Sequence, residues 1–166
     1  MNNTVTRILF VCSGNICRSP LAEAILRAEL DRRGTNGSFV VHSAGTHADH
    51  LGQDADPRMR AVARRRGHEV NHRARRVRPT DLSEYDHIIA MDGGHLRILH
   101  RYASSPEIRD RITLFRSYDP EVAADRVPDV PDPWYGEVRD FENVHDIVER
   151  TCRVMAEKLT AEPHAS

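Results

Sequence analysis

The sequence contains no long hydrophobic run, and its first residues do not show the pattern of a secretory leader. None of its apolar stretches approaches the roughly 18 residues that a membrane-spanning helix needs. The start, Met1-Asn2-Asn3-Thr4, lacks the basic segment and apolar core of a signal peptide. We therefore expect a cytoplasmic protein with no membrane partner, although export without a leader leaves no mark in a sequence.

Cysteine is also scarce. The chain has three cysteines, Cys12, Cys17 and Cys152. This odd number is too small for a disulfide framework or a four-thiolate zinc site. The cysteines therefore point to thiol chemistry, and we expect no metal and no cofactor.

The charge has no strong bias of either sign. Lysine and arginine number 24 and aspartate and glutamate 25, for a net charge of -1. No general attraction to nucleic acid or anionic membranes follows, so any anion binding must be local. The arginine-rich stretch 58–78 has no interleaved aromatic residues for base stacking. A solvated helix face is favoured over a nucleic-acid site.

The length of 166 residues fits one domain, 1–166, in which about 1–5 and 161–166 are expected to be flexible. Strand and helix patterns alternate along it. The predicted strands are 7–12, 39–42, 86–91 and 111–115. The predicted helices are 20–33, ended by Gly34; 57–66; one after Gly94 through Tyr102; and 141–159, with Asp140 as N-cap.

This alternation predicts an α/β fold, with a parallel sheet covered by helices on both faces. Ligands in such sheets bind beyond the carboxyl ends of the strands. Those ends carry Cys12, then Ser43-Ala44-Gly45, then Asp92, then the proline-rich loop 117–137. We expect these four segments to meet at one edge.

The loop between the first strand and the first helix has the features of an anion site. Amides of residues 13–18 can face an anion at the helix N-terminus, and Gly14 permits the backbone angles that this requires. Arg18, with five residues between it and Cys12, adds a bidentate donor. An isolated pair of this spacing is more often a buried thiol and a solvated charge. The preceding strand, Gly14 and the Ser19-Pro20 helix start favour the site.

The same surroundings favour the thiolate of Cys12 over the thiol. A phosphate held by the loop would present its phosphorus to this sulfur. The loop donors would then stabilise the equatorial oxygens during in-line displacement.

The loop that contains Cys12 and Arg18 resembles that of a known family. "VCSGNICRSPLAEA" is similar to the signature loop of the low-molecular-weight protein tyrosine phosphatases, and "SAGT", "DPR", "HRAR", "MD" and "DVPDPWYG" continue the resemblance over essentially the whole chain. The resemblance implies a four-stranded parallel sheet, a phosphocysteine intermediate at Cys12, phosphate binding by Arg18 and a general acid at Asp132. It also implies phosphotyrosine-containing protein substrates and phosphate as product.

Asp132 suits the role of acid on chemical grounds. The departing phenolate benefits from a proton, and a partly desolvated carboxyl near phosphate retains one more readily. Pro131 and Pro133 stiffen its backbone. A turn aspartate is the alternative, and this is the interpretation we favour for Asp125 and Asp129.

Other loop residues receive supporting roles. Cys17 is either a packed thiol or, as the resemblance implies, the partner of Cys12 in a reversible disulfide. Cys152 is expected in the core. By resemblance, Asn15, Ser19 and His72 brace the loop and Ser19 stabilises the thiolate, although His72 has exposure as its alternative. Ser43 and Asp92 are also supporting candidates, with a helix N-cap as the alternative for Asp92.

The sequence departs from the family in the substrate cleft. Asp49 and His50 stand where most relatives have an aromatic wall, and His95 where many have asparagine. Trp134 and Tyr135 can supply the other wall. Ile16 favours an aryl phosphate, since relatives acting on phosphoarginine carry threonine there. The predicted substrate-binding residues are Ser13, Gly14, Asn15, Ile16, Cys17, Asp49, Trp134 and Tyr135.

Two other functions compete with the phosphatase. A thiol-dependent arsenate reductase on this fold needs two further cysteines near the third strand, and residues 73–101 contain none. A phosphate-binding module without turnover would lack the nucleophile or the acid, and both are present.

Overall fold

The computed structural model describes residues 4–35 and 37–161, so most of the two predicted flexible ends, 1–3 and 162–166, lies outside the described residues. The strands are β1 (Thr6–Cys12), β2 (Phe39–Gly45), β3 (His87–Ala90) and β4 (Ile112–Leu114). The helices are α1 (Arg18–Arg32), α2 (Pro57–Arg65), α3 (Gly93–Tyr102), α4 (Pro106–Asp110) and α5 (Val138–Ala161), with short 3-10 helices η1 (Pro79–Ser83) and η2 (Phe115–Tyr118). No helix of the described part could cross a membrane.

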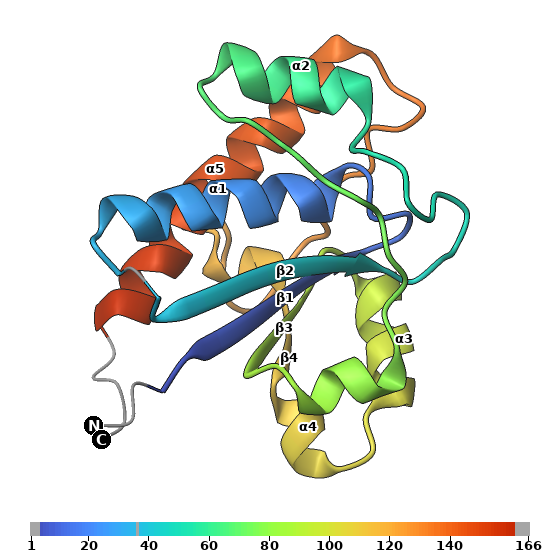
Figure 1. The fold of residues 1–166 in the computed structure, drawn as a ribbon, viewed down its shortest axis with the longest axis vertical. Coiled ribbons are helices and arrows are strands. Elements are labelled where there is room, and N and C mark those ends of the chain that lie inside the picture. Colours follow the sequence, from blue (N-terminus) through green and yellow to red (C-terminus); the bar gives the residue numbers. More distant parts are fainter. Residues whose placement is uncertain (1–3, 36, 162–166) are drawn as a thin grey trace.

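The four strands form one parallel sheet in the order β2-β1-β3-β4 (Figure 1). The predicted α/β fold, a single domain with a four-stranded parallel sheet, is confirmed. β1 lies in the interior and pairs with β2 along its whole length, from Thr6 with Phe39 to Cys12 with Gly45. The carboxyl ends of these two strands are therefore adjacent.

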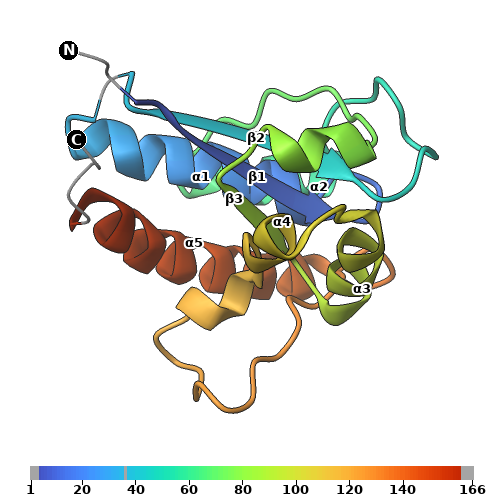
Figure 2. The ribbon, with the colours of Figure 1, turned by 90° about the horizontal axis from the view of Figure 1, so that it is seen from below.

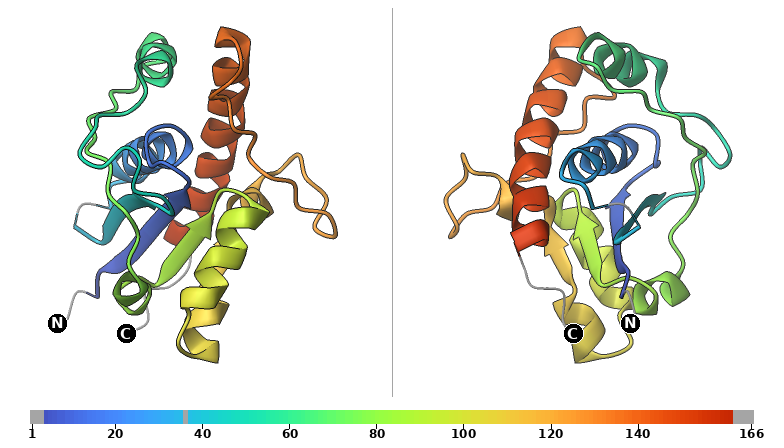
Figure 3. Two further views of the ribbon diagram at one scale, coloured as in Figure 1. Left: turned by 90° about the vertical axis from the view of Figure 1, so that its right-hand side faces the viewer. Right: turned by 60° about the vertical axis from the view of Figure 1, so that its left-hand side comes forward.

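The side chains of β1 alternate between two apolar layers. Ile8 and Phe10 belong to the core shared with α1 and α5, whereas Leu9 and Val11 belong to the core shared with η1 and α3. Figures 2 and 3 show α1 and α5 on one side of the sheet and α3 on the other. All four side chains are fully buried. Burial on both faces explains why this strand reads as an unbroken apolar run.

Several predicted element ends differ from the observed ones. β2 continues to Gly45, three residues beyond its predicted end. The prediction of Asp140 as N-cap was wrong, because α5 begins at Val138. Asp140 lies in the first turn, where its Oδ2 accepts a hydrogen bond from the Glu137 amide at 2.7 Å. The prediction of Gly34 at the end of α1 was right, with a φ of 73° that suits glycine.

The loop between η2 and α5 projects from the body of the molecule (Figure 2) and is fixed near both ends. The buried Asp119 accepts hydrogen bonds from Arg150 of α5, at 2.9 and 3.0 Å. Further along, the Val130 amide donates to the Met91 carbonyl at 2.9 Å. These two anchors bring the segment that follows Val130 back to the carboxyl end of the sheet.

Candidate active site

A small pocket of about 160 Å³ lies at the carboxyl end of β1. Three separate segments line it, as the strand order predicts for a parallel sheet. Asn15, predicted among the substrate-binding residues, does not line the pocket with its side chain, and neither do Ser43 and Asp92. Ser43 accepts a hydrogen bond from Asn15, and Asp92 accepts one from Arg18. The lining residues are Cys12, Ser13, Gly14, Ile16, Cys17 and Arg18 from the loop, His47, Asp49 and His50 after β2, and Asp132, Trp134 and Tyr135 from the long loop.

Cys12 ends β1 and is almost completely buried at the base of the loop. Its Sγ lies 2.9 Å from the Oγ of Ser19 in the first turn of α1. A hydroxyl at this position donates to a thiolate and stabilises the negative charge. Ser19 is itself fully buried, so this contact is not shared with solvent.

The backbone of the loop offers unused donors. None of the amides of residues 13–17 donates a hydrogen bond to any group in the described part of the chain. α1 begins directly after them, at Arg18. Free N–H groups beside a helix N-terminus form an anion site.

Asn15 shapes this loop. Its φ of 57° makes it the one non-glycine residue with a positive φ among those described. Its Nδ2 donates to Ser19 and Ser43 at 2.9 and 3.0 Å, and its Oδ1 accepts from the Arg75 amide at 3.0 Å. The buried amide therefore ties the loop to α1, to β2 and to the segment after α2.

The reason given above for Gly14 was wrong, because its φ is not in the positive range that favours glycine. The loop has its left-handed residue one position later, at Asn15. A Cβ at Gly14 would lie 2.8 Å from His50 Cδ2, so the His50 ring would have to move to make room for a side chain. Gly45 is more restricted still, because its Cβ would lie 2.5 Å from the Ser13 carbonyl oxygen.

His72 braces the loop from behind and is not exposed. Its Nε2 lies 2.7 Å from the Asn15 carbonyl oxygen and 3.0 Å from Asn15 Oδ1. Both neighbours are acceptors, so Nε2 carries the proton and donates. Burial lowers the pKa of His72, which keeps the ring neutral.

Arg18 is held in place by groups that are far away in the sequence. Its Nη1 donates to Asp92 Oδ2 at 3.0 Å and to the Val130 carbonyl at 2.9 Å. Its Nη2 lies 3.6 Å from Asp132 Oδ2. The guanidinium is thus buried beside the loop with one edge towards the pocket.

Asp92 performs both of the roles considered for it. Its Oδ1 accepts from the His95 amide at 2.9 Å and caps α3, while its Oδ2 binds Arg18. Burial would raise the pKa of this carboxyl, but the His95 amide and the charge of Arg18 outweigh burial and lower it. Asp92 is therefore a stable anion that positions Arg18.

Asp132 lies at the mouth of the pocket, with its side chain half exposed. Its Oδ1 accepts from the Trp134 amide at 3.1 Å. The other loop aspartates do not reach this pocket: Asp129 accepts from the Gly93 amide at 2.8 Å, and Asp125 is exposed. Asp132 therefore makes a turn contact and also lines the pocket. The interpretation of Asp129 as a turn aspartate was wrong, because it binds the start of α3 instead.

The walls of the cleft come from Trp134 and His50, whose ring centroids lie 5.4 Å apart. The Arg58 guanidinium lies over the Trp134 ring, 5.3 Å from its centroid, and restrains the indole. Tyr135 lines the mouth, but 95% of its surface is exposed, so it can move. Asp49 is also exposed at the mouth.

Some functional contacts were not foreseen from the sequence. His95 Nε2 lies 2.8 Å from the Ser13 hydroxyl, so this departure from the family reaches the loop itself. His47 lines the pocket, and Arg75 braces Asn15 through its amide. The motif that contains Arg75 was visible, but a backbone contact leaves no signal in a side-chain pattern.

All three cysteines are free and buried. Burial raises the pKa of Cys17, and the neighbouring Cys12 and Asp56 raise it further, so Cys17 is held as a thiol. Cys152 packs in the core against α1, with its Sγ 3.7 Å from the Ala22 carbonyl, as predicted.

The arginines of the stretch 58–78 are mostly paired with carboxylates. Arg65 and Arg66 bind Glu142, and Arg64 binds Glu69. These pairs agree with the predicted solvated helix face. A group with metal-ligand chemistry, His68, His145 and Glu149, lies nearby, but Arg66 donates to His145 Nδ1 at 3.2 Å and brings a competing cation to it.

Together, the fold and the pocket define a parallel α/β protein whose anion loop presents a cysteine. The family model of the low molecular weight phosphotyrosine protein phosphatases matches residues 7–165. A low molecular weight protein-tyrosine-phosphatase of Streptomyces coelicolor is 44% identical over 143 residues, covering 86% of this chain and 87% of that protein. The low molecular weight phosphotyrosine protein phosphatase of Homo sapiens is 36% identical over 152 residues, covering 91% and 94%.

A crystal structure of a protein tyrosine phosphatase from Entamoeba histolytica, with Hepes in its active site, has a TM-score of 0.87 at 35% identity. The similarity covers 93% of this chain and 97% of that one. The chain belongs to the low molecular weight phosphotyrosine protein phosphatase family, and it is a phosphatase of that family.

Proposed function

We propose that this phosphatase hydrolyses phosphotyrosine in proteins through a phosphocysteine intermediate at Cys12. One observation carries the mechanism. Cys12 and Arg18 from one loop, and Asp132 from a distant part of the sequence, line one pocket of about 160 Å³. Each has the chemistry that one part of the reaction needs: a nucleophile, a phosphate clamp and a proton donor.

In the first step the Cys12 thiolate attacks phosphorus, and the bond to the phenolic oxygen breaks. Ser19 stabilises the thiolate through its 2.9 Å contact. Arg18 and the amides of residues 13–17 bind the three non-bridging oxygens, whose charge they stabilise in the transition state. Asp132 gives its proton to the departing phenolate, a contribution of about 10²–10⁴ in rate.

In the second step water attacks the phosphocysteine. Asp132 is now a carboxylate and takes a proton from this water. The sulfur–phosphorus bond breaks, phosphate leaves, and the Cys12 thiolate is restored. Arg18 supplies positive charge and the loop amides supply hydrogen bonds to the phosphoryl oxygens, so turnover in our proposal needs no metal ion.

The pocket favours an aryl phosphate. Trp134 and His50 offer flat faces at its mouth, and the buried Ile16 lies in its lining. A phenyl ring would pack against the exposed faces of these groups, with its phosphate at the base of the pocket. Asp49 at the mouth would disfavour peptides with acidic neighbours of the phosphotyrosine.

Cys17 gives the enzyme a means of protecting its nucleophile. Oxidation of Cys12 by a peroxide produces a sulfenic acid, and attack by the Cys17 sulfur forms a disulfide and releases water. One molecule of a cellular thiol then forms a mixed disulfide with one cysteine, and a second molecule releases that cysteine. Both cysteines return as thiols, and the two small thiols leave as a disulfide. This chemistry, which requires Cys12 to be reduced for activity, favours action in the cytoplasm.

The test is the hydrolysis of para-nitrophenyl phosphate in the presence of a chelator. Cys12→Ser is expected to lose turnover, whereas Cys152→Ala, which removes a core thiol, retains it. Asp132→Asn is expected to slow turnover by about a hundredfold, most strongly with poor leaving groups. Asp125→Asn, an exposed aspartate of the same loop, is the matched control. Full activity of Cys12→Ser, or a metal requirement, would refute the mechanism.

A further inference from the structure

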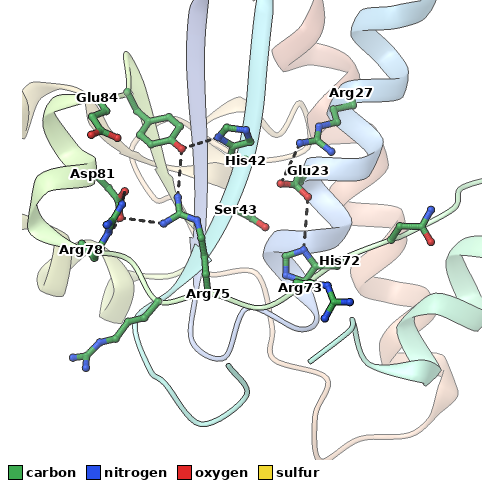
Figure 4. Close-up of a pocket in the computed structure, with 13 residues that line it drawn as sticks. Glu23, Arg27, His42, Ser43, His72, Arg73, Arg75, Arg78, Asp81 and Glu84 are labelled. Atoms are coloured by element: carbon green, nitrogen blue, oxygen red, sulfur yellow. Dashed lines mark hydrogen bonds and ion pairs between the residues drawn. The ribbon is translucent and has the colours of Figure 1, made fainter. Parts of the chain in front are cut away.

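The catalytic loop is held at two adjacent residues by different parts of the chain. His72 and Arg75, from the wall of a cavity of about 660 Å³ behind the loop (Figure 4), make hydrogen bonds to Asn15. The carbonyl of the next residue, Ile16, accepts from the Asp56 amide at 2.7 Å. Asp56 is the N-cap of α2, so this helix begins in direct contact with the catalytic loop.

Arg58, in the first turn of α2, connects Asp56 to the long loop. Its Nε and Nη2 donate to the two carboxylate oxygens of Asp56, at 3.1 and 2.8 Å. Its Nη1 donates to the Trp134 carbonyl at 3.1 Å. The guanidinium also lies over the rings of Trp134 and Phe141, 5.3 and 4.6 Å from their centroids. Burial would raise the pKa of Asp56, but the hydrogen bonds from Arg58 outweigh burial and lower it, so the carboxylate stays charged.

The segment 131–137, which carries Asp132, has few other attachments. Among the described residues, the bond from Arg58 to the Trp134 carbonyl is the one hydrogen bond that reaches this segment from outside it and α5. Asp132 is tied to the same tryptophan, because its Oδ1 accepts from the Trp134 amide at 3.1 Å. The position of the Asp132 carboxyl therefore depends on Trp134, and the position of Trp134 depends on Arg58.

We propose that Arg58 is a positioning residue for the general acid. A continuous series of contacts runs from the phosphate-binding loop through Asp56, Arg58 and Trp134 to Asp132. These contacts fix the acid relative to the loop that binds the phosphate, and so relative to the oxygen that leaves. Arg58 does not line the catalytic pocket, so it acts through Asp132 and not on the phosphate. The inference rests on the proposed function, in which Asp132 is the acid.

The test compares kcat/KM for phenyl phosphate, which has a poor leaving group, with kcat/KM for para-nitrophenyl phosphate, which has a good one. A poor leaving group depends more strongly on the proton of Asp132. Arg58→Gln is expected to lower kcat/KM about thirtyfold for phenyl phosphate but only about threefold for para-nitrophenyl phosphate. Arg65→Gln, which removes an arginine of the same helix that binds Glu142, is the matched control and should resemble the wild type with both substrates. Equal losses with both substrates in Arg58→Gln would overturn the proposal.

A second measurement separates positioning of the acid from a disturbance of the phosphate-binding loop. The binding of phosphate as an inhibitor uses Arg18 and the loop amides and does not require the acid, so its inhibition constant should change less than about twofold in Arg58→Gln. A rise in this constant that parallels the loss of kcat/KM would contradict the assigned role. Arg58→Lys keeps the charge but not the planar group that reaches Asp56 and Trp134 together, so it should show the same pattern with a smaller loss. This variant decides the question if Arg58→Gln does not fold.

A double variant tests whether Arg58 acts through Asp132. Asp132→Asn and Arg58→Gln/Asp132→Asn are measured with the same two substrates. If Arg58 acts only through the acid, the double variant should be no slower than Asp132→Asn with phenyl phosphate. A further loss of the size seen in Arg58→Gln alone would refute the inference. Failure of the proposed mechanism gives a different result, because Asp132→Asn would then slow both substrates equally or not at all.

Discussion

The Ser13 hydroxyl and the His95 imidazole meet at 2.8 Å behind the catalytic loop. On the other side of the ring, Nδ1 lies 3.2 Å from Asp92 Oδ1. A carboxylate beside Nδ1 favours the proton on that nitrogen, so Nε2 accepts from Ser13. The ring thus connects a loop residue to the carboxylate that positions Arg18.

This connection predicts a loss of stability in acid. Burial, only partly offset by the charge of Asp92, lowers the pKa of His95 to about 4, from the usual 6.5. Between these values the unfolded chain binds a proton that the folded chain excludes, so stability falls as pH drops from 6.5 towards 4. At pH 4.5 the cost is about 2–3 kcal/mol. The measurement is urea unfolding at pH 7 and 4.5: His95→Asn should lose less stability than the wild type, and an equal loss would contradict this.

Gly45→Ala is expected to destabilise the fold by about 1–3 kcal/mol, because the new methyl group would lie 2.5 Å from the Ser13 carbonyl oxygen. The loop must shift to relieve this contact, so kcat should fall as well. Gly93→Ala is the control, since its Cβ meets nothing closer than 3.5 Å. The measurements are the free energy of unfolding and the kcat of both variants. Unaltered values for Gly45→Ala would contradict the prediction and show that the loop can shift without loss of stability or activity.

Asp92→Asn is expected to lower kcat/KM by about ten- to a hundredfold, because Arg18 loses the charge that positions it. Asp129→Asn removes a carboxylate from the same helix end, where it accepts from Gly93 and does not touch Arg18, and it serves as the control. The readout is kcat/KM together with the inhibition constant of phosphate. Equal changes in both variants would mean that Asp92 acts only as the N-cap of α3 and does not position Arg18.

Ser19→Ala should slow both turnover and alkylation of Cys12 by iodoacetate at pH 7, by about tenfold. The hydroxyl lies 2.9 Å from the sulfur and is buried, so no water replaces it. Asn15 Nδ2 would also lose an acceptor but keeps Ser43. Unchanged alkylation would mean that the hydroxyl does not stabilise the thiolate.

Asp49→Asn should reduce discrimination against acidic peptides. The exposed Asp49 lies at the mouth of the pocket, where it repels carboxylates beside the phosphotyrosine. We compare kcat/KM for a peptide with basic flanks to kcat/KM for one with acidic flanks. At low salt this ratio should be about two- to fivefold lower in the variant than in the wild type. The measurement is kcat/KM for two matched phosphopeptides; identical ratios would remove Asp49 from the recognition of substrate.

The sequence was most informative where a pattern is local. β1 is buried on both faces and reads as an apolar run, and Gly34 ends α1 with the conformation that glycine favours. The sequence was least informative about contacts between segments that are far apart in the chain. The Arg75 amide and Asn15 Oδ1 are 60 residues apart, and no periodicity predicts their contact.

The error at Gly14 has a related cause. Glycine was assumed to take the unusual backbone angle, but Asn15 takes it, since asparagine tolerates this region and its side chain gains four partners there. α4 was not predicted because five residues are too few for a periodic signal. His95 was noted only as a substitution, and its contact with Ser13 required the fold.

Arg18 enters the reaction already immobilised by Asp92 and Val130. A free arginine side chain would lose about 2 kcal/mol of rotamer entropy when it closed on a phosphate. Here this entropy is already lost when the chain folds, before substrate binds. More of the interaction energy of the guanidinium is therefore available to stabilise the phosphoryl group in the transition state.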